Sequence, residues 1–100
     1  MIIKLIGKTH ASEIIKSLEK NDELHFGNIC KYVKGHKNSI NRILQELYDE
    51  GIVEKREENY SPKIPKSYYK LTDFGKEVSK IIDQLEDLEH KYYKAKNKPL

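Results

Sequence analysis

The chain has 100 residues, of which 37% are hydrophobic and 35% are charged, and its formal net charge is +3. This length fits one domain with a modest core. One cysteine excludes an intramolecular disulfide, and no apolar run approaches the ~20 residues that a membrane-spanning helix needs. The first residues lack the length and cleavage site of a signal peptide, so we expect a cytoplasmic protein without a membrane partner.

Charge is sorted along the chain. No Asp or Glu occurs between Glu23 and Glu46, and acidic residues are concentrated near residues 83–89. The middle segment is therefore the basic part, which favours a polyanionic partner. Its Lys and Arg residues are Lys31, Lys34, Lys37 and Arg42.

Two helices are predicted in the first third of the chain. Residues 1–6 are too short to assign and fit either a helical turn or an extended arm. Ser12 is the expected N-cap of the first helix, Asn21-Asp22 its end, and Gly35 the expected left-handed residue after the second helix. The apolar positions that predict these helices are Ile14, Ile15 and Leu18, then Phe26, Ile29, Cys30 and Val33.

A third helix and a β-hairpin follow. The helix is expected to begin near Asn38 or Ser39 and to stop at Gly51. Residues 52–71 indicate a hairpin whose long tip contains Pro62 and Pro65, with Tyr69 and Leu71 on one face of the returning strand. The apolar stripe of the third helix is Ile40, Ile43, Leu44 and Leu47.

The last helix carries a heptad pattern. Thr72 is its expected cap, and apolar residues follow at alternating spacings of three and four. Such a stripe is too long for so small a core, so we expect a second copy to cover it, with Glu86, Asp87 and Lys91 tuning the pairing. Lys94 to Leu100 lack a pattern and are expected to fray. The predicted dimer interface is Val78, Ile81, Leu85, Leu88 and Tyr92.

Two motifs in this order carry a family resemblance. Gly51-Ile52-Val53 follows a helix, and a Tyr-x-Leu-Thr-x-x-Gly run extends from Tyr69 to Gly75. Together with the apolar segments before them, from Leu5 onward, they resemble HxlR-type regulators within the MarR and PadR winged-helix group, over roughly residues 5–78. The resemblance implies an α+β, mainly helical fold, a winged helix-turn-helix with a C-terminal dimerisation helix. The expected organisation is a DNA-binding domain at 1–75, a dimerisation helix at 76–94 and a flexible tail at 95–100.

The resemblance also implies that the third helix enters the major groove of duplex DNA and that the hairpin, or wing, contacts the flanking backbone or the minor groove. Arg pairs with guanine and Asn or Gln with adenine, so the outward face of the third helix has the chemistry to read base edges. The predicted recognition residues are Lys37, Asn38, Ser39, Asn41, Arg42 and Gln45. The predicted wing contacts, which would hold phosphates, are Lys55, Arg56, Tyr60, Lys63 and Lys66.

No catalytic or cofactor motif was found. The four histidines are scattered, Cys30 has no second cysteine at metal-ligand spacing, and no phosphate-binding glycine loop is present, so we predict no metal, cofactor or enzyme activity. The leading interpretation is a DNA-binding regulator, a repressor acting as a homodimer on an inverted repeat. The alternatives are a winged-helix module for protein partners and a non-specific, chromatin-like DNA-binding protein.

An effector remains unidentified from the sequence. Any ligand would lie between the last helix and the winged domain, where aromatic residues could line a cleft. We expect these residues to serve the core and the interface first. The candidate aromatic residues are Tyr68, Tyr69, Phe74, Tyr92 and Tyr93.

Overall fold

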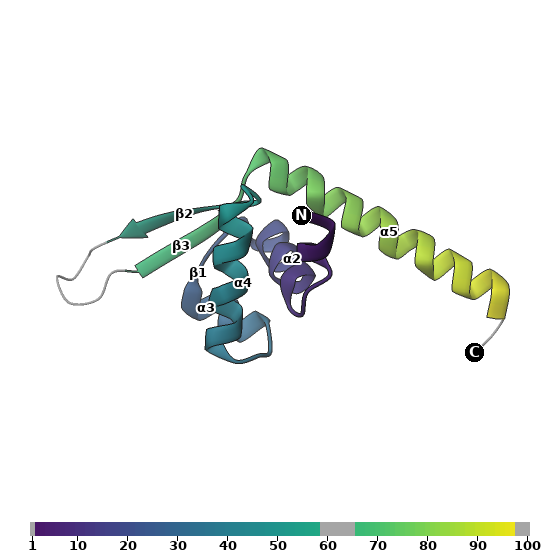
Figure 1. Cartoon of the computed structure of the whole chain (residues 1–100), viewed down its shortest axis with the longest axis horizontal. Helices are drawn as coiled ribbons and strands as arrows, with labels where there is room; N and C mark the ends of the chain where they lie inside the picture. Colours follow the sequence, from purple (N-terminus) through teal and green to yellow (C-terminus); the bar gives the residue numbers. More distant parts are fainter. Residues whose placement is uncertain (1, 59–65, 98–100) are drawn as a thin grey trace.

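The computed structural model describes residues 2–58 and 66–97, and within them the predicted winged helix-turn-helix is confirmed (Figure 1). None of the helices in this part of the chain is both long and apolar enough to cross a membrane. The helices and strands are α1 Ile2–Ile6, α2 Ala11–Asn21, β1 Glu23–His25, α3 Phe26–Tyr32, α4 Lys37–Asp49, β2 Val53–Glu58, β3 Lys66–Leu71 and α5 Asp73–Asn97.

The core lies where α2, α3 and α4 meet the sheet and the first turns of α5. All four apolar residues predicted for α4 are buried, as are Ile14, Ile15 and Leu18 of α2. Since one face of each helix is apolar and buried, the opposite face of α4 is left to solvent. The buried positions of α4 are Ile40, Ile43, Leu44 and Leu47.

The sheet is antiparallel with the strand order β1-β3-β2. β2 and β3 form the predicted hairpin, with Val53 opposite Leu71, and Tyr69 and Leu71 are buried on one face as expected. No pattern in the sequence predicted β1. This strand has three residues and one buried side chain, Leu24, which lies opposite Tyr69, so it is defined only by its pairing with β3. The proline-containing tip lies outside the described residues.

The two motifs of the family resemblance meet at one junction. Gly51 ends α4 with φ +76°, the left-handed conformation that glycine adopts without strain. Thr72 caps α5 as predicted, because its Oγ1 accepts a hydrogen bond from the Gly75 backbone N–H at 2.9 Å and donates to the Gly51 carbonyl at 2.6 Å. Gly75 packs so closely on this turn that a Cβ there would lie 2.0 Å from the Ile52 carbonyl oxygen.

Two predicted helix boundaries were wrong. α2 begins at Ala11 after His10, which has φ 73°, so Ser12 lies inside the helix and is not its N-cap. α3 ends at an extended Val33, and Gly35 does not have a positive φ. Gly35 instead makes room for a neighbour, because a Cβ there would lie 2.6 Å from Nε2 of His10.

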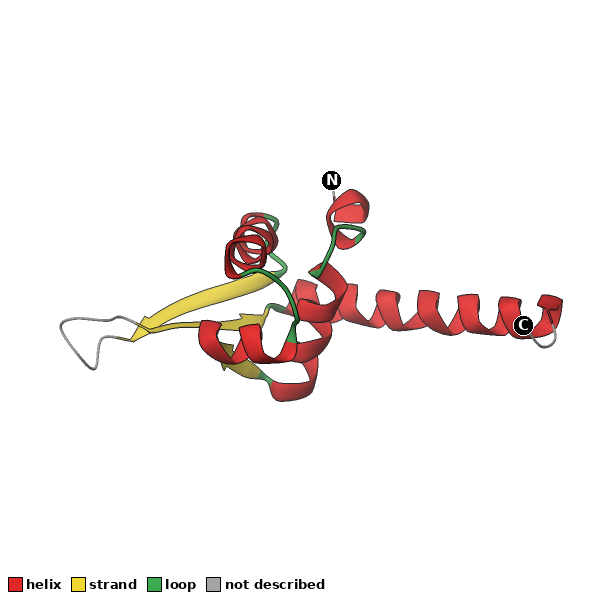
Figure 2. Cartoon of the chain, turned by 90° about the horizontal axis from the view of Figure 1, so that it is seen from below, coloured by secondary structure: helices red, strands yellow, loops and turns green. Residues whose placement is uncertain are grey.

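The last helix is longer than predicted. α5 begins at Asp73 and continues to Asn97, beyond the predicted end of the helix at residue 94, while 98–100 lie outside the described residues. Its first turns pack on α2, where Ser79 is fully buried, and the remainder projects away from the body of the molecule (Figure 2). Lys16 of α2 forms ion pairs with Asp83 and, at 3.1 Å, with Glu86, where α5 leaves the body of the molecule.

Candidate nucleic-acid interface

The outward face of α4 presents the side chains that the sequence predicted for DNA recognition. Lys37, Asn38, Asn41, Arg42 and Gln45 are exposed, and Ser39 is partly buried. The first nine residues of the helix, 37–45, include no acidic residue. The helix therefore offers hydrogen-bond donors and positive charge where a DNA duplex would approach, without carboxylates that would repel phosphate.

Both helices of the helix-turn-helix are capped by histidine. The Nδ1 atom of His25 accepts a hydrogen bond from the Asn28 backbone N–H, and Nδ1 of His36 accepts one from the Asn38 N–H, each at 3.3 Å. α4 consequently begins at Lys37, one or two residues before the predicted start. Sequence patterns favour Ser, Thr, Asp or Asn as N-caps, so a histidine cap gave no recognisable signal.

Gln45 and Arg42 have different neighbours along α4. The Gln45 side-chain amide donates to Asp49 Oδ1 at 3.0 Å, one helical turn further on. Arg42 and Ser39 line a cleft of about 540 Å³ between α4 and the turn from α1 to α2. Lys8 and Glu46 line the same cleft, and the sequence analysis assigned a role to neither residue.

A basic side chain predicted for the wing is paired with carboxylates in the structure. Arg56, predicted to hold phosphate, pairs with Glu23 of β1 at 2.7 Å and with Glu58, and its guanidinium lies 4.5 Å from the centroid of the Tyr68 ring. The hydrogen bond from Arg56 lowers the pKa of the Glu23 carboxyl. These contacts link Arg56 to β1 and to its own strand, β2.

The other predicted wing residues are only partly described. Lys55 lies 3.5 Å from Glu57, and Lys66 is exposed. Both lysines border a hollow of about 310 Å³ between the hairpin and α4, which Asn41 lines from the α4 side. The structure thus brings part of the wing and part of the recognition helix to one place. Tyr60 and Lys63 lie outside the described residues.

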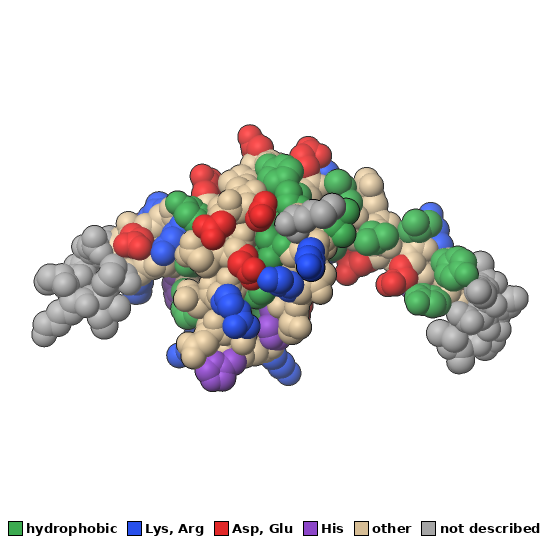
Figure 3. Space-filling view, viewed as in Figure 1, with side chains coloured by type: hydrophobic (Ala, Val, Ile, Leu, Met, Phe, Trp, Pro, Cys, Tyr) green, Lys and Arg blue, Asp and Glu red, His purple; other side chains and the backbone are tan. Residues whose placement is uncertain are grey.

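Basic side chains are concentrated at one end of the body on the face shown in Figure 3, while Lys also occurs beside Glu on the hairpin and on α5. In Figure 3 the Lys, Arg and His side chains gather toward the lower end of the body, around the α3–α4 turn and the start of α4, and acidic side chains lie over its upper side. The acid-free segment between Glu23 and Glu46 thus contributes to the basic end of this face, which includes the start of α4.

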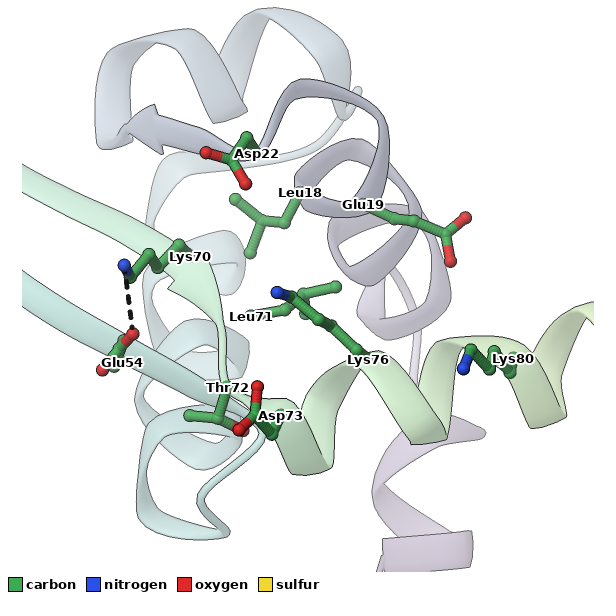
Figure 4. Close-up of a pocket in the computed structure, with 10 residues that line it drawn as sticks. All are labelled: Leu18, Glu19, Asp22, Glu54, Lys70, Leu71, Thr72, Asp73, Lys76 and Lys80. Carbon is green, nitrogen blue, oxygen red and sulfur yellow. Dashed lines mark ion pairs between the residues drawn. The ribbon is translucent and has the colours of Figure 1, made fainter.

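The aromatic residues considered for a ligand cleft lie in different parts of the described structure. Tyr69 is buried in the core, Tyr68 lies edge-on to His25, and Tyr92 and Tyr93 contact each other far along α5. A cleft of about 580 Å³ does lie between α2, β3 and the start of α5, but charged side chains line most of it (Figure 4). In that view Lys76 reaches across from α5 toward β3, and Lys70 pairs with Glu54 at 3.5 Å.

No metal site is visible in the described part of the chain, where no three His, Cys, Asp or Glu side chains gather to hold an ion. Cys30 packs against the core, and burial raises the pKa of its thiol. A thiol that is harder to ionise is less nucleophilic, so its environment is that of a structural residue.

The apolar stripe of α5 divides into two parts. Val78, predicted for the dimer interface, is 6% exposed and belongs to the core of its own chain, because the first turns of α5 pack on α2 and β3. The prediction was wrong for this residue. Glu86, expected to tune pairing between chains, is bound by Lys16 of the same chain. The remaining four residues of the stripe are between 55% and 64% exposed: Ile81, Leu85, Leu88 and Tyr92.

Comparison with known proteins identifies the family. The profile of the HxlR-like helix-turn-helix family matches residues 5–97. The chain belongs to this family. The HxlR-like protein is 42% identical over 89 residues to the uncharacterized protein MJ0944 of Methanocaldococcus jannaschii, covering 83% of this chain and 74% of that one. It is 36% identical over 86 residues to the uncharacterized HTH-type transcriptional regulator MJ0361 of the same organism, covering 86% and 79%.

The fold of the HxlR-like protein is also that of MarR-family regulators. A MarR-family transcriptional regulator from Enterococcus faecalis superposes with a TM-score of 0.83 at 18% identity, over 96% of this chain and 86% of that one. Family and fold thus place the protein among helix-turn-helix transcriptional regulators and not in a family of enzymes. DNA binding is inferred from this membership.

Proposed function

We propose that the HxlR-like protein is a transcriptional repressor that binds an inverted repeat in duplex DNA as a homodimer. The observation that carries the DNA-binding part is the exposed face of α4, which is free of acidic residues before Glu46 and presents Asn41, Arg42 and Gln45. These side chains offer base-edge hydrogen bonds, and Lys37 offers charge for phosphate. A repressor would act by occupying a promoter.

The four exposed apolar residues of α5 support the homodimer. Fully burying an exposed Leu or Ile contributes about 1.5–3 kcal/mol, and these side chains already are partly covered, so about 1–2 kcal/mol each is available. Four residues from each of two chains give roughly 8–16 kcal/mol, against an association cost of about 4–15 kcal/mol. The free energy from burying the stripe is therefore large enough to support a dimer. Contacts around the stripe would set the final affinity.

A homodimer explains why an inverted repeat is the expected target. Two recognition helices related by a two-fold axis contact half-sites about one helical turn apart, ~34 Å or ~10 base pairs. The first turns of α5 pack on α2, and Lys16 forms ion pairs with Asp83 and Glu86; in a dimer this connection would limit the half-site spacing that the protein accepts.

Selection of binding sites from a random duplex library tests this proposal. An enriched inverted repeat with half-site centres about 10 base pairs apart would support specific binding by a dimer. Retention without enrichment would favour the chromatin-like alternative, in which the basic end holds phosphate alone. If the protein retains no duplex even at low salt, DNA binding is overturned and a protein-binding module becomes the better hypothesis. Sedimentation of the free protein gives the oligomeric state independently.

A further inference from the structure

Lys8 pairs with Glu46, the first acidic residue of α4. Its Nζ lies 2.6 Å from Oε1 of Glu46, and the two residues are 38 positions apart in the sequence. Lys8 belongs to the turn between α1 and α2, and Lys4 of α1 lines the neighbouring surface beside Asp49 and Glu50. The α1 segment thus places two lysines along the acidic C-terminal half of α4.

Glu46 is positioned to compete for Arg42. The two residues are four positions apart on α4, where side chains face each other one helical turn apart, and both line the cleft that contains Lys8. The second carboxylate oxygen of Glu46, Oε2, is buried and accepts no hydrogen bond from any described residue. An arginine drawn back toward Glu46 would be held along α4, one helical turn away, and its guanidinium would no longer extend toward a base.

We infer that Lys8 is a positioning residue for Arg42: by occupying Glu46 it leaves the arginine free to read a base. This inference rests on the proposed function, in which Arg42 contacts DNA. It assigns a role in specificity to the turn between α1 and α2, which itself need not touch DNA. The ion pair also removes a negative charge from the side of α4 that would approach phosphate.

The test is a mutant cycle measured on the selected duplex and on duplexes substituted at each base pair. Lys8→Met is expected to weaken specific binding about two- to fivefold, the range that an exposed ion pair supports. It should also lower discrimination at the base pair that Arg42 reads. Glu46→Gln in the same chain should restore both, because the competing carboxylate is gone. In an Arg42→Ala background, Lys8→Met should have no further effect on that discrimination.

Lys80→Met is the matched control. It removes one positive charge from an exposed pair with Glu77 at 3.7 Å on α5, away from α4, and should leave discrimination unchanged. Circular dichroism of each variant checks that it folds.

Two results would overturn the inference. The first is a loss of binding in Lys8→Met that Glu46→Gln does not restore, together with a slope of binding affinity against salt concentration that is smaller by about one. That result would make Lys8 a direct phosphate contact. The second is wild-type discrimination in Lys8→Met. If the wild-type protein itself selects no sequence, the proposed function fails and the inference fails with it. If the wild type selects a sequence and only the Lys8 results disagree, the inference alone fails.

Discussion

Replacing Gly75 with alanine tests the junction on which the wing and α5 depend. The added Cβ would lie 2.0 Å from the Ile52 carbonyl oxygen and 3.0 Å from its carbon, so the first turn of α5 must move by about 1.5 Å to reach ordinary contact distance. That movement strains the hydrogen bond from the Thr72 N–H to the same carbonyl, which is 3.1 Å long. The change therefore combines a steric clash with a weakened hydrogen bond.

The expected cost follows from these contributions. Overpacking costs about 1–3 kcal/mol and a lost hydrogen bond about 0.5–1.5 kcal/mol, while alanine in a helix returns about 0.5–1 kcal/mol relative to glycine. We expect a net loss of about 2–3 kcal/mol in the free energy of unfolding. For a domain of this size, that lowers Tm by roughly 10–20 °C.

Urea and thermal unfolding followed by circular dichroism measure this loss, at one fixed protein concentration because dimerisation raises apparent stability. Gly7→Ala is the control, since a Cβ there would lie 3.6 Å from its nearest neighbours, an ordinary contact. It should change stability by less than about 0.5 kcal/mol. If Gly75→Ala were equally mild, the close approach of α5 to Ile52 would be refuted.

Four further predictions concern the interface, the dimer, pH and the thiol. Arg42→Ala should cost about 1–3 kcal/mol on the preferred duplex and relax specificity at one base pair; equal losses on all duplexes in competition binding would mean that Arg42 holds only backbone. Leu85→Asp should shift sedimentation from dimer to monomer with little change in the helical circular dichroism, and an unchanged dimer would exclude this stripe as the interface. The lowered pKa of Glu23 contributes stability that is present above about pH 4.5 and is lost as pH falls through the folded-state pKa. Glu23→Gln should therefore reduce stability at neutral pH and make stability depend less on pH in the acid range. A pH profile of stability parallel to that of the wild type would contradict the pairing with Arg56. Cys30 should react with iodoacetamide more slowly in the folded protein than in urea, since burial raises the pKa of its thiol, and equal rates would show that the thiol is open.

Local patterns in the sequence determined most of the helical framework. The stripe on α4, the stop at Gly51 and the Thr72 cap were all predicted because each depends on residues a few positions apart. Periodicity identifies an apolar face, and it correctly left Asn41 and Arg42 on the exposed side of α4. These features needed no knowledge of what packs against them.

Tertiary structure alone decided which neighbour each face and charge meets. β1 exists because β3 lies beside it, Val78 is covered by its own chain while Leu85 is not, and Arg56 is held by Glu23, 33 positions away. The pair of Lys8 and Glu46 crosses 38 positions for the same reason. A repeat or a charge in the sequence specifies a local surface, but burial and pairing depend on distances between distant segments, and only the folded chain sets those distances.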